Sequence, residues 1–240
     1  MQPGAGGRRP LSARPLEPPM GTITKPEVFI VESLDFDDER EQRFEGRIVS
    51  QILALSGKRC EYYYIRTKRE LREVLTRFSD SGYRYLHLSC HGDQGSMYTT
   101  LDRIPFSRLA PLLRPHLDNR RLFVSACSMT NDALARRIMP QSGCYSILGP
   151  DQDIRFSDAA ILWASLYHVM FAADSTAMKR TVLKAKAQEV ADMYGVRLNY
   201  IGRDGSAPGG YSLTAIARQR GQRPDNALQR TGRGQLERRR

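Results

Sequence analysis

The sequence predicts an α/β protein, a three-layer α/β/α sandwich with a mainly parallel sheet. Short apolar runs that suit buried strands alternate along the chain with longer segments that have helical spacing. Two of these runs, residues 83–90 and 121–126, are separated by enough chain for the crossover that joins parallel neighbours. The length of 240 residues suits one domain of ordinary size, whose core is large enough to fold without disulfides.

The basic charge of the chain lies mainly in its two terminal segments. Residues 1–24 carry three arginines and one glutamate, a net charge of +2. Residues 218–240 carry eight arginines and two acids, a net charge of +6, and the formal net charge of the whole chain is +11. Both segments are poor in large apolar side chains, so we expect disordered tails around a folded domain at residues 25–217. Because the remaining +3 is ordinary for a folded body, nucleic acid is not an expected partner. Attachment to nucleic acid through the tails alone is a weaker hypothesis.

The N-terminal half begins the alternation of strand and helix. A strand is expected at residues 27–32, and Asp35 stands where the N-cap of the next helix belongs, with acidic residues in the first turn. The apolar stripe that should face the sheet is formed by Phe44, Ile48, Ile52 and Leu55. A second strand at 60–65 precedes the capping box of Thr67–Glu70, which predicts the start of another helix.

The C-terminal half continues the same alternation. Strands are expected at 83–90, 121–126 and 145–148, and a final hairpin at 198–201 and 211–216. Helices are expected after caps at Ser107 and Ser157, before the terminator Pro140, and over about residues 176–194. Strands that alternate with helices in this way predict right-handed crossovers and a mainly parallel sheet.

Two of the predicted strands end on reactive side chains, His91 and Cys127. If these strands are parallel neighbours, both side chains emerge at the same edge of the sheet, where open α/β sheets place their sites. A histidine beside a cysteine can generate the thiolate nucleophile and later protonate a leaving amine. The backbone N–H groups of Gly92 and Cys127 could hold the oxyanion of a tetrahedral intermediate. The pattern therefore predicts a Cys-His dyad that needs no metal and no cofactor.

These two strand ends also carry a family resemblance. The motif YLHLSCHG, which ends at Gly92, followed by RLFVSACS, which contains Cys127, resembles the motifs of the caspase-fold cysteine peptidases (clan CD). The similarity is greatest to the CHAT type and extends over about Glu27–Phe171, so the tails have no counterpart. It implies that His91 is the general base and acid, that Cys127 is the nucleophile, and that Gly92 donates to the oxyanion. It also implies a protein substrate, a regulatory protein partner and, in bacteria, a role in stress or defence.

The resemblance places part of the primary-specificity pocket in the loop after the strand that follows the cysteine. In this chain that loop contains Asp151, Asp153 and Arg155. A carboxylate there would select a basic side chain before the cleaved bond (P1), whereas an arginine would favour an acidic one. Two acids against one base favour basic or mixed specificity.

Other assignments of the reactive residues are disfavoured by strand geometry. Alternation along a strand places Cys90 on the opposite face from His91, which also argues against a zinc site built from His87, Cys90, His91 and Cys127. His87 lies inside an apolar strand and suits the core. A cysteine phosphatase would need an arginine six residues after the nucleophile, where Ala133 stands, and no phosphate-binding glycine motif follows the first strand.

The remaining features suit a cytoplasmic protein. The four cysteines show no CxxC spacing, the N-terminus has no apolar leader, and no stretch reads as long enough to span a bilayer, so no membrane contact is expected. The alternative to an active peptidase is a catalytically silent caspase-like module that binds or signals. That alternative rests on the chain being a small lone domain without a recognisable activation segment.

Overall fold

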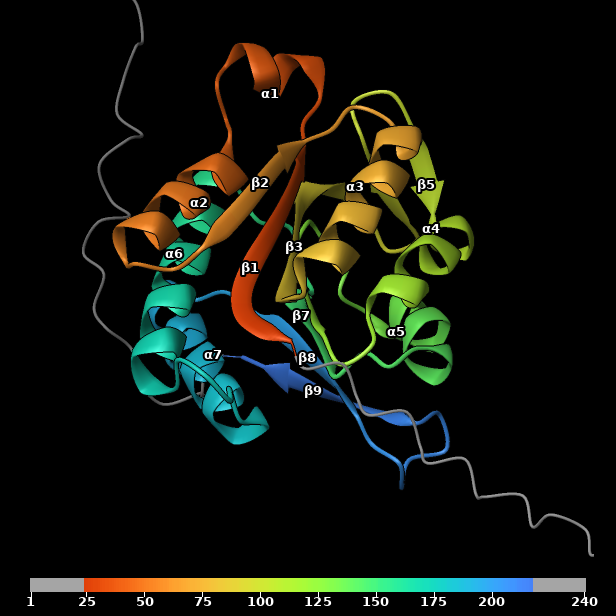
Figure 1. Ribbon diagram of the computed structural model, residues 1–240, viewed down its shortest axis with the longest axis vertical. Helices are drawn as coiled ribbons and strands as arrows, with labels where there is room; N and C mark the ends of the chain where they lie inside the picture. Colours follow the sequence, from red (N-terminus) through yellow and green to blue (C-terminus); the bar gives the residue numbers. More distant parts are fainter. Residues whose placement is uncertain (1–23, 218–240) are drawn as a thin grey trace, which may run out of the picture.

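The computed structural model describes residues 24–217, which form one sheet with helices on both of its faces (Figure 1). The predicted tails lie outside these residues, apart from Thr24. The strands are β1 (Lys25–Ser33), β2 (Cys60–Tyr64), β3 (Tyr83–Gly92), β4 (Ser96–Tyr98), β5 (Arg103–Pro105), β6 (Arg121–Ser125), β7 (Ser146–Pro150), β8 (Leu198–Arg203) and β9 (Tyr211–Ile216). The α-helices are α1 (Phe36–Arg40), α2 (Glu45–Leu55), α3 (Lys68–Ser81), α4 (Phe106–Leu113), α5 (Asp132–Ile138), α6 (Phe156–Ala173) and α7 (Arg180–Tyr194). Two short 3₁₀ helices, Arg114–His116 and Met139–Gln141, follow α4 and α5.

The sheet is mainly parallel, as the sequence predicts. Its strands lie in the order β2-β1-β3-β6-β7-β8-β9, and every pair from β2 to β7 is parallel. The strands β8 and β9 form the expected C-terminal hairpin and pair antiparallel at one edge. A small hairpin, β4 and β5, pairs antiparallel with the end of β3. The central strands β3 and β6 are therefore parallel neighbours, which confirms the predicted α/β/α sandwich.

Helices cover the two faces of this sheet in two groups. The helices α3, α4 and α5 cover one face, and α2, α6 and α7 cover the other (Figure 1). Alternation along β3 divides its side chains between these layers, so Leu86 and Leu88 join the first core cluster and Tyr85 joins the second. The same holds for β6, where Val124 faces α3–α5 and Phe123 packs against Trp163 of α6.

The long apolar helix α6 is a core helix of the second layer. It is the one helix among residues 24–217 that is long and apolar enough to cross a membrane by length and composition. The prediction that no stretch has that length is therefore wrong, because α6 has 18 residues and high hydropathy. Its side chains Leu162, Trp163 and Leu166 are fully buried in the second core cluster, and this accounts for its apolar character.

The segment after β1 differs from the single helix predicted there. Asp35 caps α1 as expected by accepting from the Asp38 N–H at 2.8 Å, but the chain then turns through Gln42, which has a positive φ of 58°. The chain becomes helical again in α2, and the side of α2 that faces the sheet differs from the predicted one. Val49 and Leu53 face the core, whereas Ile48 and Leu55 of the predicted stripe are exposed. The break after five residues lets α1 stand at the carboxyl end of the sheet.

Other helix ends follow the sequence with small shifts. The capping box is present at Thr67, which accepts from the Glu70 N–H while the Glu70 carboxylate accepts from the Thr67 N–H. The helices expected after Ser107 and Ser157 begin one residue before those serines, at Phe106 and Phe156. Their N-caps are Pro105 and Arg155, and neither makes a side-chain capping bond.

Candidate active site

His91 and Cys127 lie at neighbouring strand ends. The last paired residues of β3 and β6 are Ser89 and Ser125, and the two candidate residues each lie two positions further along. By the alternation of each strand, they project to the face covered by α2 and α6. Both line one cavity of about 70 Å³, which is also walled by Phe156 at the start of α6. The parallel register thus brings together two residues that are far apart in the sequence.

A carboxylate that the sequence reading did not single out binds the His91 ring. The Nε2 atom of His91 lies 2.6 Å from Asp38 Oδ2 and 3.6 Å from Asp35 Oδ2. The Asp38 side chain is only 6% exposed, and its other oxygen accepts from the Arg43 guanidinium at 2.6 Å. When the ring carries its proton on Nε2, the Asp38 carboxylate accepts a hydrogen bond from that N–H, and Nδ1 on the other side of the ring offers a lone pair.

The position of Asp38 follows from strand order. The strand β1 pairs with β3 up to the register Ser33–Cys90, so α1 begins beside the end of β3. The sequence signal that could have found Asp38 is the acidic turn directly after β1, read together with β1 and β3 as neighbours. We interpreted those acids only as helix-start residues, and Asp35 does serve that purpose.

The ring of His91 is also held by an aromatic contact. It meets Phe156 edge to face, with ring centroids 5.3 Å apart and planes at 89°. Such contacts favour one ring orientation. With Asp38 on one nitrogen and Phe156 against the ring, His91 keeps a defined position although its side chain is 37% exposed.

Cys127 contacts the loop that follows β7. Its Sγ accepts from the Ile154 N–H at 3.5 Å and lies 3.6 Å from the Ile154 carbonyl oxygen. The next residue, Ser128, has a positive φ of 52°, and its N–H donates to the Gln152 carbonyl. A non-glycine residue in the left-handed region costs about 1–2 kcal/mol, and such strain concentrates at functional sites. The chain therefore bends sharply just after the thiol.

The other three thiols lie in surroundings that disfavour the thiolate. Burial raises the pKa of Cys60 and of Cys144 to about 12, and it also raises the pKa of Cys90. Cys90 packs in the cluster beneath α3–α5, on the opposite face from His91 as alternation predicts. Cys90 and Cys127 both line the cavity that contains His91, but Cys90 is buried whereas Cys127 is half-buried.

Gly92 allows a close approach between the ends of β3 and β6. A Cβ at this position would lie 2.7 Å from the Met129 side chain and 3.2 Å from Ala126. The Asp93 N–H donates to the Ser96 carbonyl at 3.0 Å, and hydrogen-bonded and open pairs alternate along an antiparallel ladder. The Gly92 N–H therefore points away from β4.

The three residues proposed for the specificity pocket have other partners. Arg197 pairs with Asp151 at 3.2 Å, Arg155 pairs with Asp158 at 2.8 Å, and Asp153 accepts from the Ser128 hydroxyl at 3.2 Å. The cavity beside Cys127 is instead lined by Ile154 of this loop and by Phe156, the first residue of α6. Asp151, Asp153 and Arg155 are therefore not among the residues that line this cavity. Of the three, Asp153 reaches the residue next to Cys127.

A buried polar network lies beneath the cavity. Glu45 and Ser125 line its inner side, and the Ser89 hydroxyl donates to Glu45 at 2.5 Å. Burial raises the pKa of the neighbouring Glu32 to about 7, and the charge of Glu45 adds to the rise, while bonds from Tyr62 and from the Gly46 N–H oppose it. The sequence reading missed Glu32 and Glu45, because glutamates at a strand end and a helix start read as exposed.

One cluster within residues 24–217 has the composition of a cation site. Asp35, Asp38 and His91 bring three ligand atoms within 4.8 Å of one another. The Arg43 guanidinium already pairs with Asp38, and His91 Nε2 lies within hydrogen-bond distance of the same carboxylate. The geometry thus suits a histidine held by a carboxylate as well as it suits a metal ligand set.

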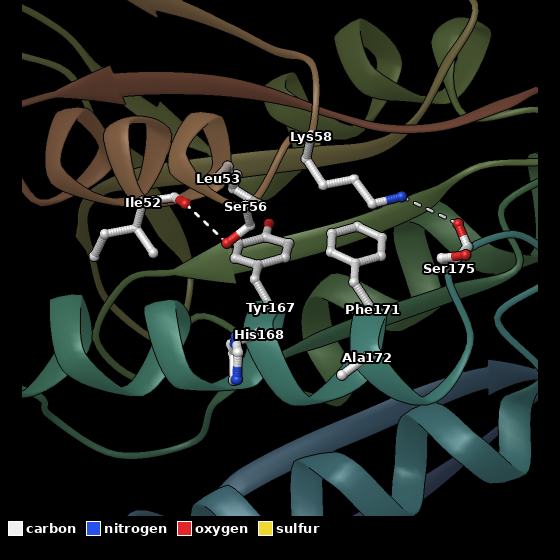
Figure 2. A pocket seen from close by; sticks show the side chains of 9 residues that line it. All are labelled: Ile52, Leu53, Ser56, Lys58, Tyr167, His168, Phe171, Ala172 and Ser175. Carbon is white, nitrogen blue, oxygen red and sulfur yellow. Dashed lines mark hydrogen bonds between the residues drawn. The ribbon is translucent and has the colours of Figure 1, made fainter.

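A larger pocket of about 360 Å³ lies elsewhere, between α2 and α6 (Figure 2). Lys58 lies over the Phe171 ring at 4.2 Å and donates to the Ser175 carbonyl, while Tyr167 lines the same wall. The pocket shares no lining residue with the cavity at Cys127 and contains no thiol.

This chain resembles known proteins in structure but not detectably in sequence. No family model matches the chain, and no curated protein sequence matches it. Among solved structures, the chain is similar to caspase-1 from Spodoptera frugiperda, with a TM-score of 0.51 and 11% identity over 86% of this chain and 96% of that one. It is also similar to the Arg-specific cysteine proteinase gingipain R, with a TM-score of 0.47 and 10% identity over 71% of this chain and 43% of that one, so it spans less than half of that protein. The chain therefore has a caspase-like fold.

Proposed function

We propose that this protein is a cysteine peptidase in which Cys127 attacks the peptide bond and His91 transfers the protons. The observation that carries the proposal is the one cavity lined by both side chains, with Asp38 2.6 Å from the His91 ring. A nucleophile, a base and a group that orients the base are the parts that covalent acyl transfer requires. The caspase-like fold, which places the pair at the carboxyl ends of two parallel strands, supports the same assignment.

The reaction runs in two halves. His91 takes the proton of the Cys127 thiol, and the sulfur attacks the carbonyl carbon of the substrate to form a C–S bond. The C–N bond then breaks, and His91 gives the proton to the leaving amine. In the second half His91 deprotonates a water molecule, which attacks the thioester, and the proton returns to the sulfur as the acid leaves.

Asp38 acts as a positioning residue in this scheme. Its carboxylate fixes the ring through Nε2 and stabilises the imidazolium that forms when the thiol loses its proton. The N–H of Gly92, which points away from β4, is the proposed oxyanion donor together with the N–H of Cys127. Both donors are backbone groups on strand ends, so their positions are fixed before the substrate binds.

Several finer features of the function are part of the same proposal. The substrate is a protein, the resemblance to the CHAT type favours a bacterial stress or defence setting in the cytoplasm, and a regulatory protein partner would control access to the site. Asp151, Asp153 and Arg155 were predicted to line the specificity pocket, and Asp153 is the one that remains near Cys127.

A catalytically silent binding module is the second candidate. The observation that favours it is the contact of the Cys127 sulfur with the Ile154 backbone rather than with the His91 ring, within the part of the chain that the structure describes. The small size of the cavity fits the same view. In an unliganded peptidase, however, catalytic hydrogen bonds are often long and tighten only when the substrate binds.

Labelling and cleavage together test the proposal. The full chain is incubated with peptidyl chloromethyl ketones and with a peptide library, and the labelled residue is identified by mass spectrometry. We expect labelling at Cys127 and cleavage that both disappear in Cys127→Ala, while Cys144→Ala, which removes a buried thiol, keeps them. Cleavage or labelling that survives Cys127→Ala would remove this residue from the nucleophile role. Absence of both in the wild-type protein would favour the binding module.

A further inference from the structure

The cavity beside Cys127 has an acidic inner wall. Glu45, the first residue of α2, lines it together with Cys127 and His91, although Glu45 itself is only 2% exposed. The other residues of that wall are small, because Ser125 of β6 and Ala159 of α6 face the same space. A side chain that entered past Cys127 would therefore meet a carboxylate at the end of its path.

Half of the Glu45 carboxylate is without a hydrogen-bond partner. Its Oε2 atom accepts from the Ser89 hydroxyl, but Oε1 has no partner among residues 24–217. His87 Nε2 lies 3.6 Å from Oε1, beyond hydrogen-bond distance, and within residues 24–217 that nitrogen also has no hydrogen-bond partner. A buried carboxylate oxygen without a donor is costly, so a ligand that supplies a donor there gains a hydrogen bond.

The charges around the cavity favour a cation. No lysine or arginine is among the residues that line it, and Glu45 is its one acidic lining residue. Outside the lining, Asp35 and Asp38 stand beside His91, and Arg43 pairs with Asp38. An acidic side chain would face Glu45 without a compensating positive charge. A lysine or arginine side chain would instead place its apolar stem along Ile154 and Phe156 and its charge near Glu45.

We propose that Glu45 is the specificity-determining residue of the peptidase and selects lysine or arginine at P1. This inference rests on the proposed peptidase function and assigns the substrate class of the same site. The acidic residue that selects P1 is then Glu45 at the start of α2, rather than Asp151 or Asp153 in the loop after β7. The reason is that Asp151 is paired with Arg197 and does not line the cavity, whereas Glu45 does.

The P1 preference of the wild-type protein gives the first test. A series of peptides that differ only at P1 (Lys, Arg, Leu, Asp) is assayed for kcat/KM, and matched chloromethyl ketones with Lys or Leu at P1 are assayed for the rate of Cys127 labelling. We expect the basic residues to exceed leucine by about 100-fold and aspartate to be the poorest. A preference for leucine or aspartate would overturn the inference.

Substitution of Glu45 gives the second test. Glu45→Gln keeps the shape and can still accept from Ser89, but it removes the charge. The preference for lysine over leucine, measured as the ratio of their kcat/KM values, should fall by about 100-fold. The matched control, Glu73→Gln, removes the same charge from an exposed position on α3 in the opposite layer, and it should keep the preference. A full preference in a folded Glu45→Gln variant would overturn the inference.

The experiment separates failure of the inference from failure of the peptidase proposal. Cleavage or Cys127 labelling without a basic preference contradicts only the role of Glu45. Absence of both cleavage and labelling contradicts the peptidase and the role of Glu45 with it. If Glu45→Gln does not fold, as its thermal unfolding would reveal, the wild-type P1 series still decides the question.

Discussion

The two faces of β3 and β6 differ in chemistry although they belong to the same strands. Towards α3–α5 the strands present Leu88 and Val124, which pack in a continuous apolar cluster. Towards α2 and α6 they present Ser89 and Ser125, both buried, and then the two candidate catalytic residues. Burying apolar groups stabilises the fold, whereas burying polar groups costs free energy unless they are paired. The face on which the chain keeps buried polar groups is therefore the face where a function is expected.

The largest expected effect belongs to the reactive pair on the polar face. Cys127→Ala and His91→Ala should each lower kcat/KM by about 10⁴-fold or more, because in the proposed mechanism each residue forms or breaks bonds. The measurement is peptide cleavage by the full chain, with Cys144→Ala as the thiol control on the other face. If either variant kept activity within tenfold of wild type, that residue would have no catalytic role, and the polar face would not differ from the apolar face in function.

The next effect tests the group that orients His91. Asp38→Asn keeps the size of the side chain but exchanges an anion for a neutral amide, so His91 loses the partner that fixes its tautomer. We expect kcat to fall by about 10³-fold with KM nearly unchanged, because the loss falls on the transition state. Asp37→Asn is the matched control, since Asp37 is an exposed acid of the same helix that pairs with Arg40. Equal activities in the two variants would leave Asp38 with a purely structural role.

The third prediction uses the buried carboxyl of Glu32, next to Glu45 on the polar face. Its pKa is raised by burial from 4.5 to about 7 in the folded state, so the folded protein holds a proton that the unfolded chain releases between these values. The free energy of unfolding should therefore fall as pH rises from about 4.5 to 7, by on the order of 3 kcal/mol. Glu32→Gln should remove this slope, as measured by urea unfolding across that pH range.

The control for Glu32→Gln is the same substitution at an exposed glutamate, Glu73. Glu73→Gln on α3 should keep the wild-type slope, because its charge is in water in both states. A slope that survives Glu32→Gln would assign the pH dependence to another group.

The smallest expected effect lies on the apolar face. Val124→Ala removes two buried methyl groups beneath α3–α5 and should lower the free energy of unfolding by about 2 kcal/mol. Cleavage per folded molecule should stay the same, since Val124 points away from the cavity. Denaturant unfolding and active-site titration of the same sample measure the two quantities. A loss of activity larger than the loss of folded protein would mean that the two faces are coupled.

Much of the fold could be predicted from local patterns. The alternation of apolar runs with helical segments gave the mainly parallel sheet, and the capping box at Thr67 placed the start of α3. The same patterns failed between Asp35 and Leu55. A turn at Gln42 breaks the predicted helix there, and no glycine or proline marks it.

The candidate site could be predicted only in part for the same reason. His91 and Cys127 were found because each ends a recognisable strand, and Asp38 and Glu45 were missed because each stands near a helix start. An acid near a helix start normally needs no explanation beyond the helix dipole. Its distance from a histidine or a thiol depends on which strands are neighbours.

The strands of the main sheet, most helices and the two reactive residues at the strand ends could be predicted from the amino-acid order, because these features depend on spacing within a few residues. The position of β3 between β1 and β6 is known only from the folded chain, and this order brings α1 and the start of α2 to the site. The contact of Asp38 with His91 joins residues 53 positions apart. Such contacts depend on the packing of the whole sheet, so no local pattern in the chain encodes them.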